Sequence, residues 1–137
     1  MWWMYALLSA LFAALTAIFA KVGIKGVDSD LATAIRTVII LFIAWVIVYF
    51  KGAHSGLSTL SRTNYLFILL SGAATGLSWI FYFRALQLGP VSKVAVVDKL
   101  SVAIAILLAV LFLNEPLTFK TVVAAALIIA GTIVMIY

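Results

Sequence analysis

Five long apolar stretches constrain this chain more than any other feature of its sequence. They cover residues 3–20, 31–50, 65–84, 91–113 and 119–137. A hydrocarbon core about 30 Å thick needs roughly 20 apolar residues per helical span, so these lengths fit membrane-spanning helices. Strands of a membrane barrel would show alternating segments of about ten residues instead, and the sequence has none. We therefore expect an all-α polytopic membrane protein with five transmembrane helices, forming one membrane unit over 1–137.

The composition supports lipid as the main solvent of the chain. Of its 137 residues, 67% are hydrophobic and only 9% are charged, and the mean hydropathy is +1.32. A soluble domain of this length needs far more polar surface. The net charge of +5 could suggest nucleic acid, but the basic residues are scattered among loops and helix ends, where membrane orientation uses them. We expect a multi-pass protein of the cell membrane, in contact with lipid and without a nucleic-acid partner.

Three charged residues lie inside predicted spans. Arg36 is roughly 8 Å deep in the second span, and Asp98 is roughly 10 Å deep in the fourth, at 1.5 Å per residue. Both spans start from the same side of the membrane, so the pattern predicts an Arg36–Asp98 ion pair. Lys99 is turned about 100° from Asp98 around an ideal helix, and we expect it to point elsewhere.

Charges at this depth have two interpretations. Arg36 and Asp98 could form a neutralised strut while Lys99 extends its amine toward the headgroups. Alternatively, one or more of the three could line a substrate path, because charged residues in spans usually face a bundle interior or a wet cavity. The residues alone leave both interpretations open.

The third span carries small and aromatic residues on one side. Gly72 and Gly76 form a G-x-x-x-G pattern, which is typical of a face that packs closely against another helix. Trp79 and Tyr82 follow it toward the next loop. They could belong to an interfacial aromatic belt, or they could form the wall of a cavity that binds cationic or aromatic ligands.

The residue types needed for catalysis or for metal binding are scarce. The chain has one histidine, His54, in a predicted loop, and no cysteine, so a haem or zinc site with several histidine or thiolate ligands is excluded. The spans contain no Ser/His/Asp set and no paired carboxylates. We expect neither an enzyme nor a cofactor or metal site.

The loop charges are nearly balanced between the two sides of the membrane. An odd number of spans places the termini on opposite sides. The N-terminal side carries Lys51, Arg62 and Lys120, and the other side carries Lys21, Lys25, Arg84 and Lys93. Counting Arg36 and Lys99 with the second side favours a cytoplasmic C-terminus. Because orientation depends on an asymmetry in basic residues, both a dual and a fixed topology stay open.

Several segments together resemble the drug/metabolite transporter superfamily, in particular its EamA-type modules. They are LATAIRTVIILFIAW in the second span, FYFRALQLGPVSKVAVVDKLSVAIAILLAVLFLNEPLT across the third and fourth, and GTIVM in the fifth. The shared elements are an aromatic-rich third span ending in Ala85-Leu86, a small-residue turn, and Glu115 after the fourth span. The chain departs from the family pattern at Asp98 and Lys99, since the fourth span there is generally uncharged.

The resemblance implies a secondary transporter that moves small metabolites or drugs by alternating access. Most members join two five-helix modules, whereas this chain is similar to the single-module bacterial and archaeal kind. It would be one half of an inverted-repeat transporter, because joining two five-span units inverts the second. We therefore expect an antiparallel homodimer or a homologous partner module. Near-balanced loop charges fit an antiparallel pair, because its two copies must insert in opposite orientations.

Two coupling modes and a second function remain open from the residues. Asp98 is the carboxylate at membrane depth that could carry a proton, and Arg36 with Lys99 could balance an anionic substrate. The alternative function is a non-transporting membrane subunit or assembly partner held by the Gly72/Gly76 face. A four-span multidrug exporter is disfavoured, because such exporters use a glutamate in the first span and this one has no acid there.

Overall fold

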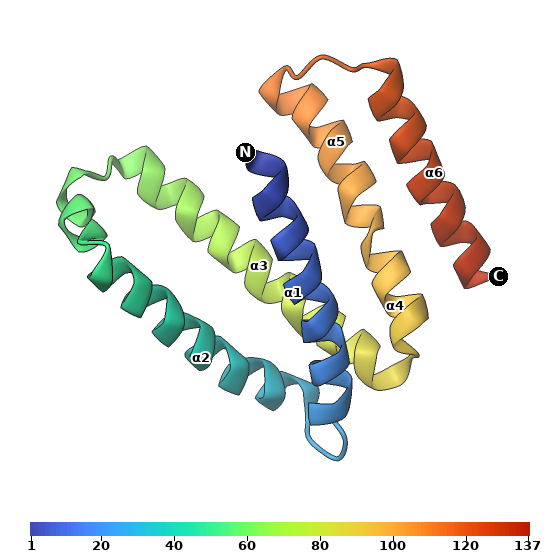
Figure 1. The fold of residues 1–137 in the computed structure, drawn as a ribbon, viewed down its shortest axis with the longest axis horizontal. Helices are drawn as coiled ribbons and strands as arrows, with labels where there is room; N and C mark the ends of the chain where they lie inside the picture. Colours follow the sequence, from blue (N-terminus) through green and yellow to red (C-terminus); the bar gives the residue numbers. More distant parts are fainter. The chain divides into compact units, whose positions relative to one another are not determined.

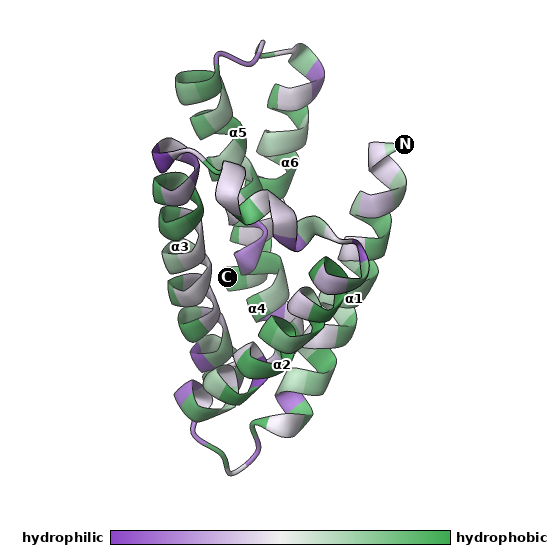
Figure 2. Ribbon diagram, turned by 90° about the vertical axis from the view of Figure 1, so that its left-hand side faces the viewer, coloured by the Kyte–Doolittle hydropathy of each residue, from purple (hydrophilic) through white to green (hydrophobic).

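The computed structural model describes all residues, Met1–Tyr137, as helices and connecting loops without strands. The elements are α1 (Trp2–Gly23), α2 (Ser29–Phe50), η1 (Ala53–Thr59), α3 (Arg62–Leu88), α4 (Val91–Asp98), α5 (Leu100–Leu113) and α6 (Phe119–Ile136). Five helical segments are long and apolar enough to cross a membrane, with α4 and α5 together forming one of them. The prediction of an all-α polytopic membrane protein is confirmed. Figure 2 shows hydrophilic residues gathered mainly at turns and helix ends.

The chain divides into two compact units. Unit 1 contains residues 1–18 and 88–137, and unit 2 contains residues 19–87. Unit 1 therefore includes most of α1 with α4, α5 and α6, whereas unit 2 includes the end of α1 with α2, η1 and α3 (Figure 1).

Helix α2 of unit 2 begins where the sequence offers a strong N-cap. The Asp28 carboxylate accepts hydrogen bonds from the backbone N–H groups of Asp30 at 2.9 Å and Leu31 at 3.0 Å. These bonds satisfy donors that the first helical turn leaves without partners. The other end of α2 leads through Gly52, at φ 65°, into the short helix η1 and then α3.

The core of unit 2 lies where the end of α1, the start of α2 and the end of α3 meet. Its buried residues are Ala20, Ile24, Ser29, Thr33, Phe83 and Leu86. Two long-range hydrogen bonds tie the same region together: the Lys21 amine donates to the Leu86 carbonyl, and the Gln87 side chain donates to the Val27 carbonyl at 3.0 Å. The end of α3 is therefore fixed to both neighbouring segments of its unit.

The fourth predicted span is interrupted in unit 1. Helix α4 ends at Asp98, a turn follows at Lys99, and α5 begins at Leu100. The Lys99 N–H donates to the Val96 carbonyl at 3.0 Å, a tighter i→i−3 bond in place of the α-helical one. Helix α6 packs along both α4 and α5. Its buried Thr132 hydroxyl donates to its own helix at Ile128 O (2.9 Å) and lies 3.4 Å from Val96 O.

The loop between α5 and α6 differs from the sequence prediction. The sequence suits Pro116 to the first turn of the last helix and Glu115 to its positive end, but residues 114–118 form a loop instead. Asn114 ends α5 in the left-handed conformation, at φ 54°, and α6 starts at Phe119. Thr118 caps α6 by accepting from the Thr121 N–H at 3.2 Å. This bond satisfies one of the backbone donors that the first turn of a helix leaves without a partner.

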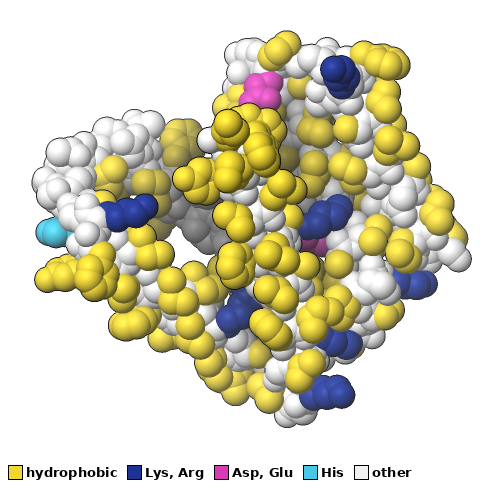
Figure 3. Space-filling view, viewed as in Figure 1, with side chains coloured by type: hydrophobic (Ala, Val, Ile, Leu, Met, Phe, Trp, Pro, Cys, Tyr) yellow, Lys and Arg dark blue, Asp and Glu magenta, His cyan; other side chains and the backbone are white.

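The surface of the helices is apolar to an extent that only lipid or further protein can cover. Hydrophobic side chains spread over the helices in Figure 3, and charged ones are few. Phe42, Leu69 and Phe112 are among the large apolar residues that the chain leaves exposed. Because monomeric soluble proteins rarely expose large contiguous apolar patches, this surface fits a protein of the bilayer.

The buried end of α3 generates a stability prediction. Leu86 is 0% exposed and Leu88 is 83% exposed, two positions apart on the same helix. Leu86→Ala leaves a cavity and should lower the free energy of unfolding by about 2 kcal/mol. This value is at the low end of the usual range, because lipid also surrounds the leucine side chain when the helices are apart. Leu88→Ala should change it by much less. Thermal unfolding in detergent measures both, and equal losses would contradict the packing described here.

Candidate functional site

Arg36 projects from α2 onto two aromatic rings of α3. Its guanidinium carbon lies 4.6 Å from the centre of the Trp79 ring and 4.2 Å from that of Phe83. Trp79 and Phe83 are four residues apart, so they share one face of the helix. Such cation–π contacts contribute about 0.5–2 kcal/mol each, with the larger values in desolvated surroundings. Tyr82 is next to Phe83, and its ring meets the Phe83 ring edge to face at 6.1 Å.

The Arg36 guanidinium lacks hydrogen-bond partners at two nitrogens. Nε and Nη1 are occluded from solvent and make no hydrogen bond. The neighbouring hydroxyls of Thr33 and Thr37 donate to carbonyls of their own helix, each at 2.8 Å. The carboxylates of unit 2, Asp28 and Asp30, form no ion pair with Arg36. The Arg36 guanidinium is therefore held by contact with aromatic rings, while Nε and Nη1 have no hydrogen-bond acceptor.

Asp98 and Lys99 pair with each other in unit 1. The Lys99 Nζ lies 3.5 Å from the Asp98 Oδ2. The expectation that Lys99 would point away from Asp98 is wrong. That expectation assumed an uninterrupted helix with 100° per residue, whereas the chain turns between α4 and α5 at this position. The pair therefore lies at the interruption of the span, with Asp98 half-buried and the Lys99 side chain mostly exposed.

Arg36 belongs to unit 2, whereas Asp98 and Lys99 belong to unit 1. The structure brings Arg36 together with Trp79, and Tyr82 lies against the Phe83 ring of the same cluster. It also brings Asp98 together with Lys99. The Arg36–Asp98 ion pair stays a prediction.

The glycine pair of α3 is open within its unit. An added Cβ at Gly72 or Gly76 would meet no atom within 4 Å. At 100° per residue, both glycines lie within about 60° of Trp79 and Phe83 around α3. The predicted packing face thus continues along the helix from the rings that hold Arg36.

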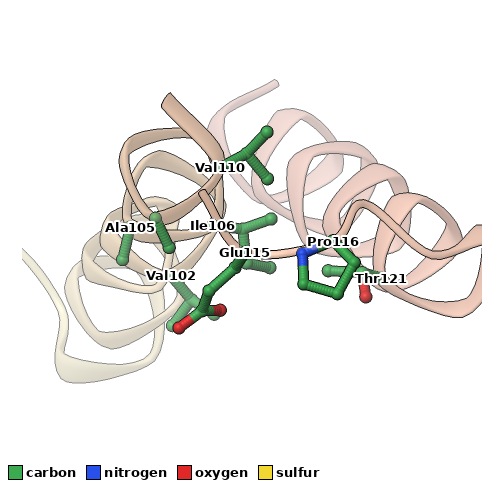
Figure 4. Close-up of a pocket in the computed structure, with 8 residues that line it drawn as sticks. Val102, Ala105, Ile106, Val110, Glu115, Pro116 and Thr121 are labelled. Atoms are coloured by element: carbon green, nitrogen blue, oxygen red, sulfur yellow. The ribbon is translucent and has the colours of Figure 1, made fainter. Parts of the chain in front are cut away.

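A shallow cleft lies beside the α5–α6 loop in unit 1. Its volume is about 270 Å³, and its lining is mainly apolar. In Figure 4, Val102, Ala105, Ile106 and Val110 contribute from α5, and Glu115 extends from the loop with its carboxylate toward that helix. A single carboxylate at the end of two spans does not resemble a catalytic or metal site. No group of three or more histidine, cysteine or acidic side chains is placed to hold a metal ion.

Two residues of these clusters were not among the predicted site residues. Phe83 contacts Arg36 more closely than Trp79 does, and the i, i+4 spacing of the two rings was a usable signal. Thr132 lies near Val96 O, just before the turn at Lys99. No sequence signal marks it, because a threonine in a membrane helix usually bonds only to its own backbone.

Five apolar spans, some of which contain charged residues, identify the chain as a polytopic membrane protein. Comparison with known proteins narrows the class to membrane transporters. The model of the EamA-like transporter family matches residues 1–137. The chain belongs to this family.

One relative covers nearly the same length. A protein of Sinorhizobium sp, named "Uncharacterized transporter in cobO 3'region", is 48% identical over 134 residues, which are 98% of this chain and 95% of that protein. No solved structure matches the chain significantly.

The turn at Lys99 generates a prediction about water access. Because the chain has no cysteine, single cysteines can be labelled without background. Lys99→Cys should react readily with a membrane-impermeant thiol reagent if the turn faces a wet cavity. Leu107→Cys is the control, since Leu107 is similarly exposed, at 58%, and lies about 9 Å from the end of α5 at Leu113. If both cysteines in native vesicles were equally unreactive toward the reagent, the turn would lie in lipid, and a wet cavity at Lys99 would be contradicted.

Proposed function

We propose that the chain is one half of a secondary transporter that moves small metabolites or drugs by alternating access. The residues that we propose for substrate binding or coupling are Arg36, Trp79 and Tyr82 in unit 2, and Asp98 and Lys99 in unit 1. The observation that carries the proposal is the charge pair at a local turn within the fourth span. Membership in a family of transporters supports it.

A turn within a span is physically suited to a solute site. The Lys99 backbone stays in the right-handed helical region, at φ −68° and ψ −10°, but its N–H bonds to the Val96 carbonyl in a tighter turn. Secondary transporters build solute and ion sites where membrane helices depart from regular α-helix. Asp98 and Lys99 add ionisable groups at the turn. Charged residues at this depth commonly mark substrate or ion pathways.

We further propose that a second copy in the opposite orientation completes the path. A five-span unit contains only one half of an inverted repeat. The open face at Gly72 and Gly76 supports close approach of another helix, since no atom lies within 4 Å of an added Cβ at either position. The near balance of basic residues between the two sides supports insertion in both orientations.

The role of Asp98 separates the two coupling modes. If Asp98 carries a proton, Asp98→Asn should abolish transport driven by a pH gradient, because the amide cannot titrate. If the protein exchanges anions through its cationic groups, the same variant should leave exchange largely intact. A pH-sensitive dye inside proteoliposomes, challenged with a panel of organic acids, amino acids and cationic dyes, measures the difference.

Glu115→Gln is the matched control, because it removes the loop carboxylate outside the spans and should retain transport in either mode. A purified protein that moves none of these solutes, yet co-purifies in fixed ratio with another membrane protein, would overturn the proposal. That result would favour the non-transporting subunit.

A further inference from the structure

The unmet donors of Arg36 call for an acceptor from outside unit 2. Guanidinium stays protonated in proteins, so the charge cannot be removed by deprotonation. Aromatic faces attract the cation but supply no oxygen acceptor for Nε and Nη1. A buried donor without an acceptor costs about 1–3 kcal/mol, and more when it is charged. A site that keeps this arrangement is stabilised when an anion enters it.

We propose that Arg36, held against Trp79 and Phe83, binds the carboxylate of a small organic acid. This inference rests on the proposed transport function and specifies its substrate class. The single guanidinium of Arg36 matches one negative charge, so a monocarboxylate forms a neutral pair with it. A phosphate dianion would keep a net charge at membrane depth. Lys99 is not a second free cation for it, because Lys99 already pairs with Asp98.

The aromatic rings beside the guanidinium offer an apolar surface for the organic part of such an acid. Trp79 and Phe83 are four residues apart and share one face of α3, and the guanidinium carbon lies 4.6 and 4.2 Å from the centres of their rings. The carboxylate would meet the guanidinium, and the apolar part would lie against these rings.

Binding can be measured separately from transport. The purified full-length protein in neutral detergent is heated with propionate, benzoate or indole-3-acetate, and with the amide of each acid. A ligand that binds the folded state raises the melting temperature. We expect the acids to stabilise the protein and the amides to do so at least tenfold less tightly, as expected for a lost hydrogen-bonded charge pair.

Matched variants assign the effect to Arg36. Arg36→Met should abolish stabilisation by the acids, and Arg36→Lys should weaken it, since an ammonium keeps the charge but loses the planar donors. Trp79→Leu should weaken it without removing the charge, which keeps the test valid if Arg36→Met folds poorly. Arg84→Met, which removes an exposed charge at the end of α3, should leave it unchanged.

Three results would overturn the inference. Equal stabilisation by acids and amides would show that the charge is not recognised. Stabilisation by phosphatidylglycerol alone, lost in Arg36→Met, would assign the site to a lipid headgroup. Strongly non-additive destabilisation in the Arg36→Met and Asp98→Asn double-mutant cycle, without any protection by acids, would assign the acceptor to Asp98.

The outcome for transport is read independently in proteoliposomes. Acids that bind through Arg36 but never cross the membrane would preserve this site and overturn the proposed transport function. Transport of other solutes, without selective binding of acids, would support the proposed transport function and overturn the carboxylate site at Arg36.

Discussion

The need to neutralise charge inside a bilayer governs the organisation of this protein. Unit 1 meets it by placing Lys99 3.5 Å from Asp98 at a turn between two helices. Unit 2 meets it only in part, since Arg36 lies against Trp79 and Phe83 while two of its nitrogens stay unpartnered. Lipid offers no acceptor for such groups, so each arrangement implies protein, water or solute nearby. Unit 1 thus neutralises its charges within itself, whereas unit 2 leaves donors that need an acceptor.

Local helix structure and function are linked most directly in the fourth span. An unbroken helix would carry Asp98 and Lys99 on different faces. The turn at Lys99 brings them together and replaces an α-helical bond by a shorter-range one. The hydroxyl of Thr132 on α6 lies 3.4 Å from the Val96 carbonyl near this turn. The turn and the charge pair therefore coincide at one place in the fourth span.

Sequence reasoning predicted the elements with strong local signals. The five spans followed from the length of the apolar runs. The turn at Lys99 was not predictable, since no glycine or proline marks it within an apolar run. The contact of Arg36 with Phe83 also depends on how α2 and α3 pack, which periodicity does not determine.

The central claim is that an inverted second copy completes the conduit, and cross-linking between copies tests it most directly. Tyr65 and Arg84 lie on opposite sides of the Gly72/Gly76 face along α3, and the chain has no native cysteine. Tyr65→Cys and Arg84→Cys are co-expressed as separate, differently tagged chains and treated with a short bifunctional thiol reagent in native membranes. Antiparallel packing of α3 predicts cross-links between position 65 of one copy and position 84 of the other. Links of 65 to 65 and 84 to 84 alone, or no links between copies, would contradict the account.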